Sequence, residues 1–306
     1  MGNLVTQSDE LGDNDVKTTI NYLLPESTVV RRYVCAGNAL STGQYSPYDV
    51  NIRDVRPTKE EYTLETKGFE LATCPTKCED FSDMAIIERD YFPELEAYIR
   101  KRTGADIVFC HMPRLRQSKK DPDRRDVQPV AGDVHVDVTE ETARNLAERW
   151  LYEQGMADYK YSRILFMSTW RVLSDPPQDF PLALLDPDTL SDEDGVLSWL
   201  IACPELPSAP YPPLPPPDTT MEDRLVDPRQ IAKEHKLIGA GYAFHYKPDY
   251  RWAYYANMTR DELLSFKLAD TDHSSAWRVP HTAFLDDRPG TVPRSSLEVR
   301  TYCIFK

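Results

Sequence analysis

Residues 133–138 place a histidine and a carboxylate at a spacing that suits metal binding. His135 and Asp137 lie in the segment DVHVDV, in which polar residues alternate strictly with valine. This alternation is typical of a β-strand, on which residues i and i+2 point to the same face. An imidazole beside a carboxylate makes two-thirds of the 2-His-1-carboxylate triad, which holds Fe(II) on one side and leaves positions for O2 and a co-substrate. Taken alone, two polar residues on a strand more often form its solvated face.

A third ligand would come from the other histidines, of which the chain has six in all. His281 is the favoured candidate, because the context Pro-His-Thr-Ala-Phe reads as the start of a late strand. His245, within a Tyr-Ala-Phe-His-Tyr segment, is the second candidate. The remaining histidines, His111, His235 and His273, have no comparable setting.

A candidate carboxylate-binding pair follows shortly after His281. Arg294 can offer a bidentate fork to a dicarboxylic co-substrate, and the hydroxyl of Ser296 lies two residues on, on the same face of the predicted last strand. Residues 286–290 predict a turn, so we expect a hairpin that brings this pair beside His281. Arg300 is the rival anchor. Because a strand rises ~3.3 Å per residue, Arg294 and Arg300 are about 20 Å apart, and only one of them can hold a given carboxylate. An ion pair with Glu298 is the simpler reading of Arg300.

The elements that must position these residues are mostly short strands. We expect strands near residues 28–34, a pair of short strands over residues 51–66 around Pro57, and further strands at 105–111, 133–138, 162–170, 182–185, 238–246, 251–256, 263–267, 281–285 and 297–305, with a loop over 112–130. Helices are expected at 82–103, ended by Gly104, and at 140–154, capped by Thr139. Few helices and no βαβ alternation favour a mainly β sandwich or barrel with helices packed outside.

Composition narrows the class further. The net charge of −14 argues against nucleic-acid binding. No apolar stretch is long enough to span a membrane, and no secretory signal is evident. The six cysteines are scattered, so free thiols in the cytoplasm are expected, and the Cys74–Cys78 pair alone does not predict structural zinc. The sequence does not indicate an oligomeric state.

Three domain assignments follow from the same composition. Residues 1–16 are acidic and are predicted to be a disordered tail, and residues 17–306 are predicted to form one domain. Residues 204–218, with eight prolines, are expected to be a surface excursion within that domain.

The chain resembles a family of iron(II)/2-oxoglutarate-type oxidoreductases that includes fungal gibberellin desaturase, the aspergillic-acid-pathway hydroxylase/desaturase and a bacterial component of cephamycin 7-methoxylation. The resemblance runs from about Asp54 to the C-terminus. The matching segments are TGA at 103–105, VHVD at 134–137, TWR at 169–171, PLA at 181–183, WAYY at 252–255, DELLSFK at 261–267, PHTAF at 280–284 and PRSSLEVR at 293–300.

This resemblance implies a double-stranded β-helix (jelly-roll or cupin-like) core, Fe(II) on His135, Asp137 and His281, and 2-oxoglutarate on Arg294. Further candidates for contact with substrate or co-substrate are Trp170, Arg171, Tyr254 and Tyr255, although the aromatic residues could equally belong to the core. Two departures from the family pattern, Val172 in place of proline and Tyr250 in place of histidine, leave the substrate class open.

The expected activity is that of a dioxygenase which uses Fe(II), 2-oxoglutarate and O2 to hydroxylate, desaturate or cyclise a small secondary metabolite or amino-acid-like substrate. One alternative keeps the iron without 2-oxoglutarate. A second is a jelly-roll partner subunit without catalytic activity, and a third is a zinc hydrolase, for which no general base is evident.

Overall fold

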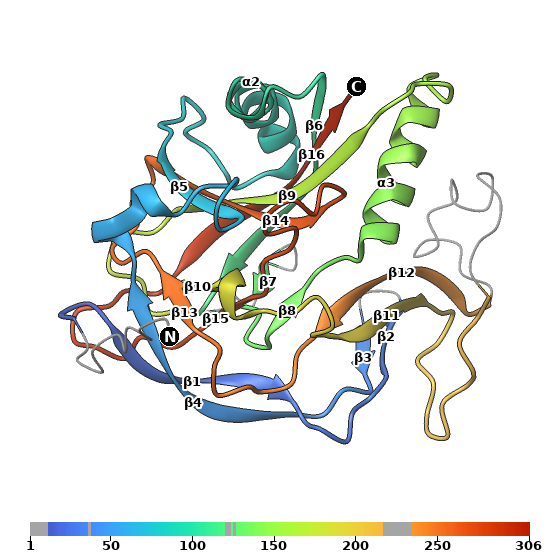
Figure 1. Cartoon of the computed structure of the whole chain (residues 1–306), viewed down its shortest axis with the longest axis horizontal. Helices are drawn as coiled ribbons and strands as arrows, with labels where there is room; N and C mark the ends of the chain where they lie inside the picture. The colour runs from blue at the N-terminus through green and yellow to red at the C-terminus, as the bar shows by residue number, and fades with distance from the viewer. Residues whose placement is uncertain (1–11, 36–37, 120–123, 125–126, 217–233) are drawn as a thin grey trace, which may run out of the picture.

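The computed structural model describes residues 12–35, 38–119, 124, 127–216 and 234–306 (Figure 1). Two β-sheets contribute apolar side chains to one shared core. The short strands predict a mainly β sandwich or barrel, and the family resemblance implies a jelly roll; the two-sheet arrangement confirms both.

The larger sheet has ten strands. Its hydrogen-bonded order is β1 (Val16–Leu23), β4 (Tyr45–Asp54), β13 (Trp252–Tyr254), β10 (Leu182–Leu185), β15 (His281–Ala283), β8 (His135–Val136), β12 (Lys236–Ala243), β11 (Val196–Ala202), β2 (Val30–Cys35) and β3 (Asn38–Ser41).

The smaller sheet has six strands. Its order is β5 (Phe69–Thr73), β14 (Glu262–Asp270), β9 (Arg163–Val172), β16 (Ser295–Phe305), β6 (Ile107–Gln117) and β7 (Gln128–Pro129). Most pairings in both sheets are antiparallel. The exceptions are β11 with β2, β13 with β4, and β6 with β7.

Strand β9 separates two apolar cores. Phe166 and Trp170 point into the core between the sheets, whereas Leu165 and Met167 join a second core on the opposite face of the six-stranded sheet. Side chains at alternate positions of a strand point to opposite faces, which explains why this strand is buried along nearly its whole length. Only residues on the inner face can therefore reach a site between the sheets.

The helices cover the six-stranded sheet (Figure 1). The predicted helix at 82–103 consists of α1 (Met84–Ile86), a π-helical turn η2 (Ile87–Tyr91) and α2 (Phe92–Thr103), with Gly104 as a left-handed C-cap at φ 73°. Helix α3 (Glu140–Glu153) packs Ala143, Ala147 and Leu151 into the inter-sheet core. Two short 3-10 turns complete the set, η1 (Arg56–Glu61) and η3 (Pro187–Thr189).

Two local predictions are wrong. The expected second strand after Pro57 is the 3-10 turn η1, because proline at the start of a turn lacks the N–H that a strand would use. The expected loop over 112–130 begins too early, since β6 continues to Gln117. A β-bulge lies between the Glu298 and Arg300 pairings, and Met112 there has φ 50°, so the strand passes Pro113 without losing its pairing partner.

The expected hairpin after His281 is also wrong. Strand β15 belongs to the ten-stranded sheet and pairs with β8 and β10, while β16 lies in the six-stranded sheet between β9 and β6. Residues 284–294 therefore cross from one sheet to the other. Crossing places β15 and β16 on opposite walls of the same interior, and not side by side.

The termini and the proline-rich segment are described in part. Residues 1–11 of the predicted disordered tail lie outside the described residues, and Val16 already begins β1. Residues 204–216 of the proline-rich segment form neither helix nor strand, and Tyr211 and Leu214 pack against Tyr33 and Ile201. Within the described part of the chain, no helix is long and apolar enough to cross a membrane.

Thr139 joins α3 to the ten-stranded sheet. Its side chain accepts a hydrogen bond from the backbone N–H of Thr142, and its own N–H donates to the carbonyl of Ala240 at 2.7 Å. We expect Thr139→Ala to lower the free energy of unfolding by about 1 kcal/mol, because the helix loses its cap. Urea denaturation measures this loss. Thr139→Asp, which keeps a capping oxygen, is the control, and equal losses in both variants would contradict the capping role.

Candidate functional site

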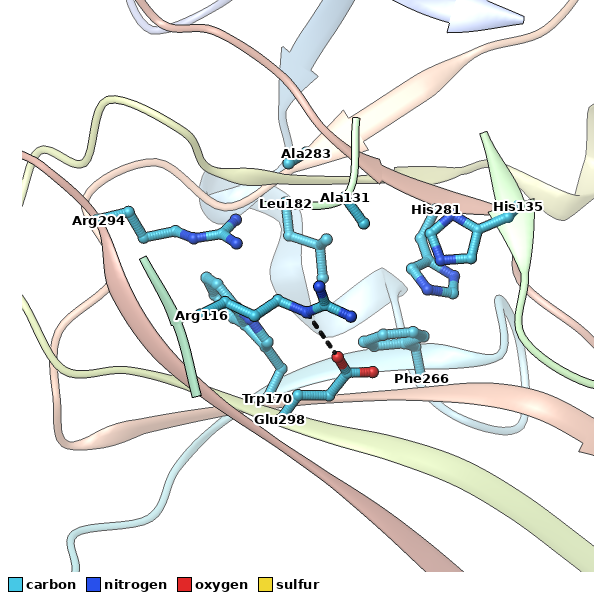
Figure 2. A pocket seen from close by; sticks show the side chains of 10 residues that line it. All are labelled: Arg116, Ala131, His135, Trp170, Leu182, Phe266, His281, Ala283, Arg294 and Glu298. Carbon is cyan, nitrogen blue, oxygen red and sulfur yellow. Dashed lines mark hydrogen bonds and ion pairs between the residues drawn. The ribbon is translucent and has the colours of Figure 1, made fainter. Parts of the chain in front are cut away.

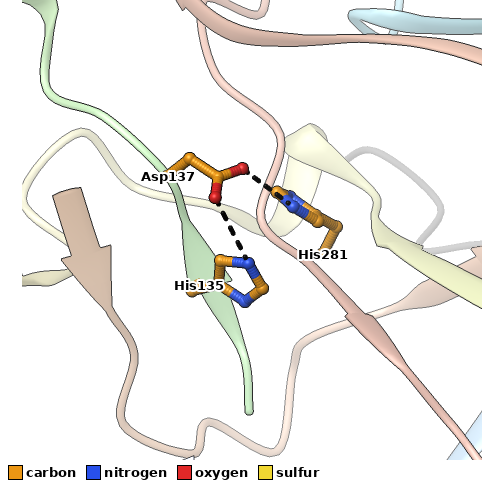
Figure 3. A group of neighbouring side chains, drawn as sticks. All are labelled: His135, Asp137 and His281. Carbon is orange, nitrogen blue, oxygen red and sulfur yellow. Dashed lines mark ion pairs between the residues drawn. The ribbon is translucent and has the colours of Figure 1, made fainter. Parts of the chain in front are cut away.

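His135, Asp137 and His281 meet between the two sheets (Figure 3). Their potential ligand atoms all lie within 4.8 Å of one another. His135 Nε2 is 3.7 Å from one carboxylate oxygen of Asp137, and His281 Nε2 is 3.4 Å from the other. The strand pairing of His135 with His281 in β8 and β15 fixes this approach. The strand expected over 133–138 is shorter than predicted, since β8 spans His135–Val136 and Asp137 lies at a bend directly after it. Local sequence thus supplies His135 and Asp137 from one short segment, and sheet topology supplies the third residue.

Backbone carbonyls orient both imidazoles. His135 Nδ1 lies 2.7 Å from the carbonyl oxygen of Asp133, and His281 Nδ1 lies 3.1 Å from that of Val279. A carbonyl can only accept a hydrogen bond, so Nδ1 carries the proton in each neutral ring and Nε2 keeps its lone pair. Both lone pairs face Asp137. Such outer hydrogen bonds are the usual means of fixing the tautomer of a metal-binding histidine.

Burial also keeps His135 neutral. Removal of the ring from water, reinforced by the neighbouring His281, lowers the pKa of His135 to about 4. The imidazole is therefore uncharged at pH 7. A neutral imidazole is the form that binds a metal ion.

Asp137 depends on Arg300 for its charge. Burial alone would raise the pKa of this carboxyl group, but Arg300, His281 and His135 together hold that pKa well below its ordinary value. Arg300 Nη2 lies 2.8 Å from Asp137 Oδ1. Asp137 Oδ2 is buried and has no hydrogen-bond partner among the described residues. One oxygen is thus held by an arginine, and the other is left for a further positive group.

Glu298 completes a buried charge network with Arg300. It accepts from Arg300, from Ser168 at 3.2 Å and from Arg116 at 3.2 Å. Burial would raise the pKa of Glu298, but Arg300 and Arg116 lower it to about 2. Glu298 is therefore ionised and accepts from three donors. Arg300 is ion-paired with both carboxylates, although its buried Nη2 forms no hydrogen bond among the described residues.

A pocket leads from the two histidines to Arg294 (Figure 2). Arg294 lies at one end of the pocket and His135 with His281 at the other, with Arg116 and Glu298 between them. Its apolar walls are Ala131, Trp170, Leu182, Phe266 and Ala283. The Phe266 ring packs against His281 with centroids 4.6 Å apart, which limits the access of water to that side.

Arg294 keeps an unsatisfied donor in this pocket, and Ser296 keeps one two residues further along the chain. Arg294 donates through Nη1 to the carbonyl of Phe180 at 2.7 Å and lies over the Trp170 ring at 5.6 Å, but its buried Nε has no hydrogen-bond partner among the described residues. The buried Ser296 hydroxyl has none either. Burial lowers the pKa of Arg294 to about 9, so the guanidinium stays charged at pH 7. Unpaired buried donors are costly, and a bound carboxylate would satisfy them.

Arg171 does not reach this pocket. Its side chain lies on the outer face of β9, where it donates to Tyr91 Oη at 3.0 Å, to the carbonyl of Cys74 at 2.8 Å and to the carbonyl of Arg260. The sequence correctly indicates that a charge in an apolar strand needs partners. Those partners are backbone carbonyls outside the pocket, so the structure gives no support to a substrate contact by Arg171.

The two tyrosine candidates also lie elsewhere. Tyr255 packs in the core against Phe69, with ring centroids 6.3 Å apart. Tyr254 packs edge-on against Phe284, and its hydroxyl contacts Asn14 and Arg288. Of the four additional candidates, only Trp170 lines the pocket. His245, the second candidate ligand, instead approaches the carbonyl of Leu23 with Nδ1 at 3.1 Å.

Sequence reasoning missed Arg116. It was assigned to a loop, but it lies on β6 with its side chain on the inner face, and it lines the pocket. The alternation of Arg114, Leu115 and Arg116 was the available signal, since Leu115 belongs to the outer core. The proline at 113 obscured that pattern.

Comparison with known proteins agrees with this architecture. The chain matches the family described as "Oxidoreductase/YMDC permease-like domain" over residues 20–205 and 217–304. It is 26% identical over 275 residues to the Fe(II)/2-oxoglutarate-dependent dioxygenase nvfI of Aspergillus novofumigatus, covering 86% of each chain. It is 27% identical over 299 residues to the hydroxylase/desaturase efuI of Hormonema carpetanum, covering 93% of each chain.

A solved structure shares the fold. The iron and alpha-ketoglutarate-dependent endoperoxidase NvfI superposes with a TM-score of 0.76 at 22% identity, over 95% of this chain and 98% of the other. With the family match over most of its length, the chain belongs to the family described as "Oxidoreductase/YMDC permease-like domain", and its resemblance to the iron(II)/2-oxoglutarate-dependent oxidoreductases is confirmed.

Proposed function

We propose that this chain is an Fe(II)/2-oxoglutarate-dependent dioxygenase that oxidises C–H bonds of a small molecule. His135, Asp137 and His281 would hold Fe(II), and Arg294 with Ser296 would bind the far carboxylate of 2-oxoglutarate. The observation that carries the proposal is that the two ends of one pocket each hold polar atoms without a hydrogen-bond partner. A triad with a free carboxylate oxygen lies at one end, and a buried arginine with an unused donor lies at the other.

The donor set fits Fe(II). Two neutral imidazoles and one carboxylate are the ligands of the facial triad, which leaves coordination positions open. Among the described residues, these three form the group that could hold a metal ion. With Arg300 on Oδ1, Asp137 is left to bind through Oδ2.

Fe(II) with 2-oxoglutarate and O2 supplies an oxidant strong enough to remove hydrogen from an unactivated C–H bond, with succinate and CO2 as co-products. The chain's residues position and shield this chemistry. Arg294 and Ser296 orient the co-substrate, and Trp170 with Phe266 keeps the pocket apolar. The network of Arg300 and Glu298 holds Asp137 in place.

The wider assignment follows the relatives. They are named as dioxygenases and as hydroxylases or desaturases, which supports a catalytic chain over a partner subunit without activity. We extend to this chain a role in oxidising a secondary metabolite or amino-acid-like substrate, with residues 17–306 as one domain. Six free cysteines agree with the cytoplasmic location expected from the sequence. An iron oxidase without 2-oxoglutarate is the second candidate, and the first test below separates the two.

We expect anaerobic addition of Fe(II) and 2-oxoglutarate to produce a weak visible charge-transfer band in the wild-type protein. His135→Ala should abolish this band, because the triad loses a ligand. The control is His245→Ala, which removes a histidine that lies outside the triad. Iron binding without a band in the wild type would exclude 2-oxoglutarate and favour the second candidate. Absence of iron binding would contradict the whole assignment.

Arg294→Gln should weaken 2-oxoglutarate binding by roughly 10- to 150-fold, since a hydrogen bond to a charged group contributes about 1.5–3 kcal/mol. Titration of the same band at saturating Fe(II) measures the dissociation constant. The 2-oxoglutarate affinity of Arg294→Lys should lie between those of the wild type and Arg294→Gln, because lysine keeps the charge but lacks the bidentate guanidinium. The matched control is Arg260→Gln, which removes an arginine that donates to backbone carbonyls on the outer face. Unchanged affinity in Arg294→Gln would overturn this anchor.

Arg300→Gln should act on the metal end. We expect Fe(II) affinity to fall about 10- to 100-fold, as is usual when the partner of a metal ligand is removed. The 2-oxoglutarate affinity of the iron-loaded protein should change much less. Because the single change leaves Glu298 without its main partner, the double variant Arg300→Gln/Glu298→Gln keeps the charge balanced as a folding control. A loss confined to 2-oxoglutarate binding would identify Arg300 as the anchor instead of Arg294.

A further inference from the structure

Arg114 is the one arginine of the buried group that has no partner among the described residues. Its neighbours on the inner face are committed: Arg300 to Asp137 and Glu298, and Arg116 to Glu298 and the carbonyl of Pro129. Within the described part of the chain, Arg114 forms no hydrogen bond or ion pair, although it lies directly opposite Glu298 in the pairing of β6 with β16.

Its position places Arg114 beside the metal end. The alternation on β6 puts Arg114 on the same face as the pocket-lining Arg116, with Leu115 pointing into the outer core. The charged groups that act on it are Arg300, Glu298, Asp137 and Arg116. Arg114 is partly exposed, whereas Arg300 is buried. Arg114 is therefore the more solvent-accessible of the two arginines that act on Asp137.

Glu298 is shared among several donors. Its oxygens accept from Ser168, Arg300 and Arg116, and among the described residues it forms no hydrogen bond or ion pair with Arg114. Burial, followed by repulsion from Arg300, lowers the pKa of Arg114 to about 10. The guanidinium thus remains charged at pH 7 while it is partly withdrawn from water. A charged guanidinium that is partly withdrawn from water is unfavourable unless an anion lies beside it.

The net charge of the buried arginines and carboxylates also favours an anionic ligand. The four arginines Arg114, Arg116, Arg294 and Arg300 face two carboxylates, those of Asp137 and Glu298. Fe(II) and doubly charged 2-oxoglutarate cancel one another and leave this excess unchanged. Asp179, which accepts from the backbone of Arg294, reduces the excess without removing it. A net positive interior in a chain of net charge −14 favours an anionic ligand.

We propose that the substrate carries a carboxylate, and that Arg114 binds it at the mouth of the site, next to the metal. This inference rests on the proposed function and adds the substrate class. A carboxylate could accept two parallel N–H bonds from the guanidinium, which would fix the distance of the adjoining carbon skeleton from the triad. The apolar pocket walls would then contact the rest of the molecule.

Isothermal titration calorimetry with pairs of probes tests this inference. Protein with Fe(II) and 2-oxoglutarate under anaerobic conditions is titrated with octanoate, cyclohexanecarboxylate, benzoate and indole-3-acetate, and separately with the amide of each acid. We expect at least one acid to bind about 10-fold or more tightly than its amide, because the amide lacks the charge. Arg114→Gln should bring that ratio close to one, and Arg114→Lys should keep part of it.

The control is Arg89→Gln, which removes a positive charge from a side chain that is 70% exposed, so it should leave the ratio unchanged. Absence of acid preference in the wild type for every pair would overturn the inference, as would an undiminished preference in Arg114→Gln. The charge-transfer band, recorded on the same samples, reports separately on Fe(II) and 2-oxoglutarate. Failure of the proposed function is thus distinguishable from failure of this inference.

Discussion

A carboxylate buried between two sheets needs a positive charge beside it, and Arg300 supplies that charge for both Asp137 and Glu298. Burial of an unpaired carboxylate would cost several kcal/mol or force it to take up a proton. The arginine prevents both outcomes, so Asp137 stays ionised next to the neutral imidazole of His135. The arrangement of the rest of the site follows from this contact, because it fixes which oxygen of Asp137 is free.

The same strand that carries Arg300 also carries the far end of the site. Arg294, Ser296, Glu298 and Arg300 alternate along one face of the chain at β16, so the two arginines lie about 20 Å apart at ~3.3 Å per residue. Arg300 is ion-paired with Asp137 and Glu298 at the metal end, while Arg294 forms no ion pair among the described residues at the other. One chain segment thereby carries both the arginine next to the triad and the arginine proposed to bind the co-substrate. The β-bulge in β6 opposite this strand brings in Arg114 and Arg116 as further charges.

Much of the site was predictable because it depends on short-range pattern. The polar–valine alternation puts His135 and Asp137 on one face, and the strand context of His281 distinguishes it from the other histidines. The helix ends were equally predictable from nearby residues, since Thr139 caps the start of α3 and Gly104 ends α2. The predictions that failed depend on contacts between residues distant in sequence. A turn at 286–290 resembles a hairpin, yet the chain crosses between sheets, and no local signal encodes that choice. The sequence also could not place Arg171, Tyr254 and Tyr255 relative to the pocket, because whether a residue of a buried strand faces the pocket or another core depends on packing partners distant in sequence.

The most direct measurement is a crystal structure of the protein grown without oxygen, with Fe(II) and 2-oxoglutarate bound. We expect the metal to be bound by Nε2 of His135, Nε2 of His281 and one oxygen of Asp137, with Arg300 still ion-paired with the other oxygen. We also expect the far carboxylate of 2-oxoglutarate on Arg294 and Ser296. Metal bound elsewhere, or a 2-oxoglutarate carboxylate held by Arg300 in place of Asp137, would contradict the account.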